Sequence, residues 1–153
     1  MIATAIDHTY RYGFASSLTQ GRLALAVDSS LLKTPAKAKA TPPVFFSGTL
    51  LKPKRTGDLL RGVSEIVNAR YNNPNWRRLA DPVITVSDDL VRFEGFSGCC
   101  SAYARLDLLP DAVEGDRPAR GTTNVDFNPA MLAALASLRD SDDVALKIGA
   151  EQI

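Results

Sequence analysis

The sequence predicts an α+β fold with a mostly antiparallel sheet of about six strands and two helices. Most apolar segments are short and alternate between apolar and polar residues, as strands with one buried face do. Only two segments repeat their apolar residues at helical spacing. They are separated from the strands rather than alternating with them, which favours α+β over α/β. The chain has 153 residues, a length typical of one domain, so we expect residues 1–153 to fold as a single domain.

Alternation or short β-branched and aromatic runs mark the predicted strands. Leu23, Leu25 and Val27 share one face of an alternating segment, and residues 44–51 have the composition of a buried strand. Gly48 in this run suggests a bulge or a close approach of two backbones. The predicted strands are residues 2–12, 22–28, 44–51, 83–87, 90–96, 102–108 and 144–148.

Two segments carry an apolar stripe at helical spacing. The first is residues 58–71, with Thr56 or Asp58 as its N-cap. Its stripe consists of Leu59, Leu60, Val63, Ile66, Val67 and Tyr71. The second is residues 129–138, which begins with a proline at a position that tolerates it and follows the good N-cap Asn128.

Two other segments are predicted to be loops. Residues 29–43 combine prolines, lysines and small residues, so we expect a mobile loop rich in extended conformations. Residues 110–124 show neither sustained alternation nor helical spacing, and we interpret them as loop-like.

The net charge of +1 gives no global field that would select nucleic acid or a membrane as partner. The charge is nevertheless unevenly distributed along the chain. Residues 1–79 carry 12 Lys and Arg against 4 Asp and Glu, whereas residues 80–153 carry 6 against 13. Either the fold interleaves the two halves and the asymmetry disappears, or one side of the molecule is basic and attracts an acidic partner.

The composition also bears on the cellular compartment. The N-terminus lacks the basic and apolar regions of a signal peptide, and no window approaches the roughly 20 apolar residues that span a bilayer. The two cysteines are adjacent rather than spaced as in a disulfide framework. We therefore expect a cytoplasmic protein that does not enter a membrane.

No cofactor or metal site is predicted. Cys99, Cys100 and His8 supply at most three zinc ligands, and adjacent strand residues point to opposite faces. A cysteine nucleophile with His8 as its base is the enzyme alternative. Buried or packing roles for both cysteines are the more ordinary interpretation.

The candidate binding residues are basic or aromatic. No acid lies between residues 29 and 57, so this basic stretch could hold nucleic acid non-specifically; a solubilising loop is the plainer interpretation. An aromatic and charged cluster around residues 7–12 and one later arginine are further exposed-face candidates. The candidates are Tyr10, Arg11, Arg105, Lys37, Lys39, Lys52, Lys54 and Arg55.

Four stretches of the chain together resemble the N-terminal region of bacterial SWIM zinc-finger family proteins. They are residues 7–12, 93–100, 103–107 and, as the longest match, 121–129, which reads Gly-Thr-Thr-Asn-Val-Asp-Phe-Asn-Pro. The Cys-x-Cys and Cys-x-His pairs of that family's zinc module are absent, so zinc binding is not carried over. The resemblance implies an accessory domain for assembly or recognition, in proteins that occur beside chaperone-like AAA ATPases and von Willebrand A-type proteins.

The sequence therefore predicts a non-enzymatic binding module that contacts a protein partner. Nucleic-acid binding through residues 33–55 and a small enzyme with a cysteine nucleophile are the alternatives.

Overall fold

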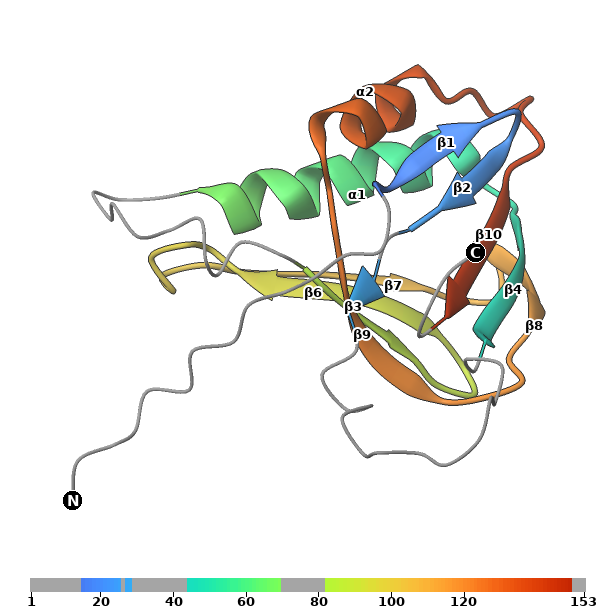
Figure 1. The fold of residues 1–153 in the computed structure, drawn as a ribbon, viewed down its shortest axis with the longest axis horizontal. Helices are drawn as coiled ribbons and strands as arrows, with labels where there is room; N and C mark the ends of the chain where they lie inside the picture. Colours follow the sequence, from blue (N-terminus) through green and yellow to red (C-terminus); the bar gives the residue numbers. More distant parts are fainter. Residues whose placement is uncertain (1–14, 26, 29–43, 70–81, 150–153) are drawn as a thin grey trace.

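The computed structural model of the chain describes residues 15–25, 27–28, 44–69 and 82–149. These residues form two helices and ten strands, and the strands are arranged in two five-stranded sheets (Figure 1). The α+β class and the mostly antiparallel pairing are confirmed, although the strands are more numerous than the six expected. The predicted strand at 2–12 and the predicted loop at 29–43 lie outside the described residues.

The first sheet, sheet A, contains one parallel pair among antiparallel neighbours. In spatial order it consists of β1 (Ser17–Thr19), β2 (Arg22–Ala24), β10 (Ala145–Gly149), β4 (Val44–Leu50) and β8 (Val113–Asp116). β10 runs parallel to β2 and antiparallel to β4. The last strand of the chain therefore lies between strands from its first third.

The second sheet, sheet B, is antiparallel throughout. Its spatial order is β3 (Val27–Asp28), β9 (Gly121–Val125), β5 (Val83–Val86), β6 (Val91–Phe96) and β7 (Tyr103–Leu108). β5, β6 and β7 follow one another along the chain as a meander, and β9 returns to pair with β5. β7 is consequently an edge strand.

The two helices pack on each other, and α1 also packs on sheet B and α2 on sheet A. α1 (Pro53–Asn68) contacts α2 (Pro129–Ser137) as well as β6 and β7, and α2 also contacts β1. Figure 1 shows α1 extended above sheet B, with α2 beside it at the end nearer sheet A. The Asn128 side chain caps α2 by accepting a hydrogen bond from the Met131 N–H at 2.9 Å, as predicted.

One apolar core fills the space between the sheets and the helices. Alternate residues of β10 and β6 point into it, because successive side chains of a strand face opposite sides. α1 and α2 add residues one or two helical turns apart. The largest fully buried side chains are Phe46, Phe93, Leu23, Leu60, Ile84, Leu108, Met131, Leu135, Leu146 and Ile148.

α1 begins five residues earlier than predicted. Pro53 is its first residue and neither Thr56 nor Asp58 caps it. Proline is suited to the first helical position, where a backbone N–H would lack an intrahelical partner in any case. The N–H of Thr56 then donates to the carbonyl oxygen of Lys52 at 2.9 Å.

The buried face of α1 also differs from the predicted stripe. Leu60, Val63 and Val67 are buried, but Leu59 and Ile66 are 45% and 39% exposed. Small residues take the place of the large ones, since Thr56, Gly57 and Ser64 are buried instead. A Cβ on Gly57 would lie 2.7 Å from the carbonyl oxygen of Leu135, so α1 packs against the backbone of α2.

The loop prediction for residues 110–124 was wrong, because β8 lies within this segment and β9 begins in it. Both strands pair with neighbours distant in sequence, β8 with β4 and β9 with β5. β8 passes so close to β4 that a Cβ on Gly48 would lie 2.0 Å from the carbonyl oxygen of Glu114. This is the close backbone approach expected at Gly48. The predicted strand at 22–28 is divided into β2, in sheet A, and β3, in sheet B.

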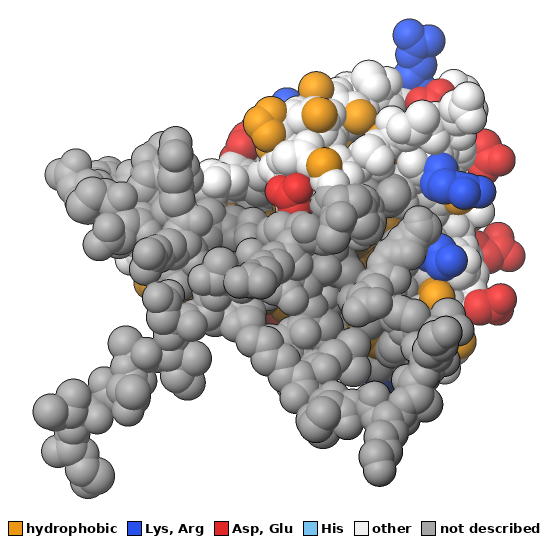
Figure 2. Space-filling view, in the orientation of Figure 1, with side chains coloured by type: hydrophobic (Ala, Val, Ile, Leu, Met, Phe, Trp, Pro, Cys, Tyr) orange, Lys and Arg blue, Asp and Glu red, His pale blue; other side chains and the backbone are white. Residues whose placement is uncertain are grey.

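The basic and acidic halves of the chain interleave in the described fold. In sheet A, β10 of the acidic half lies between β2 and β4 of the basic half, and β8 of the acidic half lies beside β4. Lys52 also pairs with Asp111 across 59 residues. On the side where sheet A lies, Figure 2 shows cationic and anionic side chains near one another. Neither of the described helices has the length and apolarity to cross a bilayer.

Two glycines of α1 provide a test of its close packing. We expect Gly57→Ala to lower the free energy of unfolding by about 1–3 kcal/mol, because the new methyl group would overlap Leu135 and overpack the interface. A Cβ on Gly62 would enter open space. Gly62→Ala should therefore raise the free energy of unfolding by about 0.5–1 kcal/mol, because alanine has the higher helix propensity. Urea unfolding measures both, and equal shifts of the two midpoints would contradict the packing.

Candidate functional site

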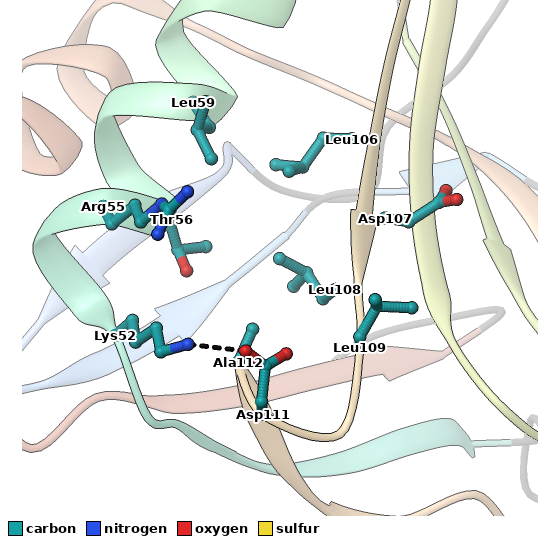
Figure 3. Close-up of a pocket in the computed structure, with 10 residues that line it drawn as sticks. All are labelled: Lys52, Arg55, Thr56, Leu59, Leu106, Asp107, Leu108, Leu109, Asp111 and Ala112. Carbon is teal, nitrogen blue, oxygen red and sulfur yellow. Dashed lines mark hydrogen bonds and ion pairs between the residues drawn. The ribbon is translucent and has the colours of Figure 1, made fainter.

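A groove with a volume of about 230 Å³ lies between the first turns of α1 and the end of β7. Figure 3 shows Arg55 and Leu59 of α1 on one side and Leu106 and Leu108 of β7 on the other, with their side chains directed toward the space between them. Asp107 points away from it, as alternation along a strand requires. The residues that line the groove are Lys52, Arg55, Thr56, Leu59, Leu106, Asp107, Leu108, Leu109, Asp111 and Ala112.

An ion pair closes one end of the groove. The Nζ atom of Lys52, just before α1, donates to Oδ2 of Asp111 in the β7–β8 turn at 2.6 Å (Figure 3). This hydrogen bond is the main reason why the pKa of Asp111 lies below its usual value, and the charge of Arg55 adds a smaller contribution. The turn itself is held by the N–H groups of Ala112 and Val113, which both donate to the carbonyl oxygen of Leu109.

Arg55 differs from the other cations at the start of α1. Lys54 pairs with Asp58 at 2.9 Å, and Lys52 is paired with Asp111. Within the part of the chain that the structure describes, the Arg55 side chain has no ion pair or hydrogen bond. An exposed guanidinium without a carboxylate partner, beside an apolar groove, suits a bidentate hydrogen bond to a carboxylate.

Apolar side chains are exposed at the rim of the groove. Leu59 is 45% exposed and Leu109 is 48% exposed, and Leu106, which also lines the groove, is half-buried. Single exposed leucines are ordinary on a protein surface, but neighbouring ones beside a concave site are typical of binding surfaces. The groove therefore combines apolar contacts with an available cation.

The outer face of β7 carries an ordered charge network. Arg92 Nε donates to Oδ1 of Asp107 at 2.8 Å, and Arg105 Nε donates to the same atom at 3.0 Å. These bonds lower the pKa of Asp107 from 3.8 to about 2, and the bond from Arg105 makes the largest contribution. Arg105 is thus occupied by its own strand neighbour and holds Asp107 as an anion.

An aromatic pair continues this outer face toward the β6–β7 turn. Phe96 and Tyr103 have ring centroids 5.1 Å apart and are 59% and 48% exposed. The Tyr103 hydroxyl donates to the Glu94 carboxylate, which raises the pKa of Tyr103. The pair lies on the face of sheet B opposite to the groove, because Asp107 and Tyr103 share the outward phase of β7.

The two cysteines lie in the β6–β7 turn. Cys100 is exposed with a positive φ of 57°, and the Cys99 thiol lies 2.9 Å from the Ser101 hydroxyl. The other member of the enzyme alternative, His8, lies outside the described residues. Among the residues that are described, no three His, Cys, Asp or Glu side chains gather in a metal-binding arrangement.

The structure brings some of the predicted binding residues together. Lys52 and Arg55 line the groove, and Lys54 lies on the same turn of α1. Arg105 belongs to β7 but lies on the opposite face. The remaining candidates, Tyr10, Arg11, Lys37 and Lys39, fall outside the described residues.

Sequence reasoning missed the apolar half of the groove. Leu59 was assigned to the apolar stripe of the helix, and Leu106 lies within the strand predicted at residues 102–108. Leu109 follows that strand without an assignment, and Asp111 lies in the segment 110–124 that was interpreted as loop-like. The width of the apolar stripe on α1 could have indicated this exposed surface. The stripe contains more large apolar residues than one face of a helix can bury.

Comparison with known proteins finds no match for the chain among family models, curated proteins or solved structures. The resemblance to the SWIM family therefore remains a prediction.

Asp107→Asn tests the network on β7. A folded-state pKa below the unfolded value stabilises the protein above about pH 4, and this stabilisation is lost as the pH falls from about 4 to 2. We expect the substitution to lower the free energy of unfolding at pH 7 by about 1 kcal/mol, since the site is partly exposed. The difference from wild type should shrink toward pH 2.

Urea unfolding at pH 7, 4, 3 and 2 measures this difference. Asp140→Asn, on an exposed turn, is the control and should leave the profile of wild type unchanged. A difference that stays constant from pH 7 to pH 2 would contradict the assigned pKa.

Proposed function

We propose that this chain is a non-enzymatic binding module and that the groove between α1 and β7 receives a segment of a protein partner. The observation that supports this most is that one concave site combines exposed Leu59 and Leu109 with the Arg55 side chain, which has no ion pair or hydrogen bond among the residues that the structure describes. Apolar contacts supply affinity in such sites and a few polar groups fix orientation. The SWIM resemblance, with its implication of recognition work, agrees with this proposal.

The partner segment is acidic and apolar. Four basic residues lie on or just before the first turns of α1, namely Lys52, Lys54, Arg55 and Arg61, while Asp58 and Asp111 are the acids that pair with three of them. Arg55 is the remaining cation, so a carboxylate is the group that completes the site. A leucine, isoleucine or valine beside that carboxylate fits the space between Leu59 and Leu106.

The nucleic-acid alternative remains a prediction that the groove supports less well. Lys52 and Lys54 both pair with carboxylates, which reduces the charge available to phosphates. The aromatic pair of Phe96 and Tyr103 lies on the other face of sheet B, so it provides no stacking partner beside these cations. A cytoplasmic location also remains a prediction from the sequence.

A displayed library of 12-residue peptides, selected against the wild-type chain, tests the proposal. We expect enriched peptides to combine Asp or Glu with Leu, Ile or Val. Arg55→Glu should weaken their binding about tenfold or more by reversing the charge that meets the carboxylate. Leu59→Ser should weaken it by a similar factor, because apolar contact area is lost.

The same helix offers matched controls. Arg61→Glu makes an equal change of charge, and Ile66→Ser an equal change of polarity, at exposed or partly exposed positions that do not line the groove. Both should bind the enriched peptides within about twofold of wild type. Peptides that bind all four variants equally, or a library that yields no peptide, would overturn the proposed function.

A further inference from the structure

Within the described part of the chain, the outer edge of β7 presents a row of backbone groups without a strand partner. Of the four edge strands in the described sheets, β1, β3 and β8 have three, two and four residues, whereas β7 has six. Among the described residues, β7 pairs only with β6. A long edge strand is a template for pairing with another chain.

The ladder between β6 and β7 defines which groups point outward. The N–H of Ser97 donates to the carbonyl oxygen of Ala102 at 2.8 Å, so this pair is hydrogen-bonded. Hydrogen-bonded and non-bonded pairs alternate in antiparallel ladders. Ala104, Leu106 and Leu108 therefore bond with β6, while the N–H and C=O groups of Tyr103, Arg105 and Asp107 face the open edge.

This open edge borders the groove. Leu106 and Leu108, which line it, alternate with the residues whose backbone groups point outward (Figure 3). A strand added at spacing of about 4.8 Å from β7 would place every second side chain on the groove side, near Leu59 and Arg55. The side chains between them would lie on the outer face beside Arg105 and Tyr103.

We infer that the partner segment binds by strand addition to the free edge of β7, an inference that rests on the proposed function. The recognised segment is extended, with apolar residues alternating with polar ones, and one groove-side position carries a carboxylate that meets Arg55. Backbone hydrogen bonds to Tyr103, Arg105 and Asp107 supply affinity, and the groove supplies specificity, as in other complexes formed by strand addition.

Charge favours a different protein over a second copy of this chain. Two β7 edges paired antiparallel about a twofold axis through their centre would bring Arg105 near its own counterpart, and like charges opposite each other destabilise a strand pair. Such a pair would also leave each Arg55 without a carboxylate from the partner strand. An acidic segment avoids placing a second arginine opposite Arg105, and it supplies a carboxylate to Arg55.

Proline at position 105 tests the inference on the protein side. The Arg105 N–H faces the open edge, so Arg105→Pro removes no bond to β6, and proline is tolerated on edge strands. We expect the variant to unfold within about 1 M urea of Arg105→Ala, which also lacks the guanidinium. Its affinity for the enriched peptides should nevertheless be about tenfold or more below that of Arg105→Ala, because the edge is blocked.

Backbone N-methylation tests the inference on the peptide side. One enriched peptide is synthesised with N-methyl groups at its odd positions and, separately, at its even positions. Strand addition predicts that one version loses about tenfold or more in affinity while the other binds nearly as well as the parent, because only alternate N–H groups face β7. Equal losses in both versions would overturn strand addition.

The outcomes separate this inference from the proposed function. Peptides that depend on Arg55 and Leu59 but bind Arg105→Pro as tightly as Arg105→Ala leave the groove as the site and overturn strand addition alone. Dimerisation of the free chain that Arg105→Pro abolishes, measured by analytical ultracentrifugation, would assign the edge to a second copy and overturn the inference as well.

Discussion

The close fit of α1 between α2 and sheet B is the constraint on which the other features depend. At its first turns, Gly57 allows the backbone of α2 to approach, and at its last turn a Cβ on Gly95 of β6 would lie 2.7 Å from Val67. The N–H of Gly98, in the β6–β7 turn, donates to the carbonyl oxygens of Val67 and Ala69 at 3.1 and 3.0 Å. The helix is therefore fixed against α2 near its start and against β6 and the β6–β7 turn near its end, and the groove beside β7 is a consequence of that placement.

This placement also explains why apolar residues remain on the surface. A helix that packs through small residues approaches its neighbours closely, and its larger side chains then lie beside the contact rather than within it. Leu59 consequently reaches the mouth of the groove, and Arg55, one turn earlier, has space to meet a ligand. Because both side chains stand on a helix rather than on a loop, a bound segment would meet a surface that is already ordered, which reduces the entropic cost of binding.

The local pattern of the sequence predicted much of the fold but only half of the candidate site. The β5–β6 hairpin, β7, the core of α1 and the Asn128 cap depend on alternation, helical spacing or capping chemistry within a few residues. β8 and β9 depend on partners far away in sequence, and β8 has only Val113 buried among exposed Glu114, Gly115 and Asp116. The cations of the groove were visible as a basic stretch, whereas Leu59 and Leu109 were not, because exposure is decided by tertiary packing.

The charges on β7 do not conflict with its role as an open edge. Charged side chains usually protect edge strands from unwanted pairing, and Arg105 and Asp107 fit that pattern in sequence. Their side chains, however, lie on the outer face and bind each other and Arg92, so they leave the backbone groups of the edge accessible. The same network keeps the strand extended and in register with β6. An edge that is shielded from apolar partners yet held in an extended conformation favours a segment with alternating polarity over a uniformly apolar one, and the cation at Arg55 narrows that choice to acidic segments.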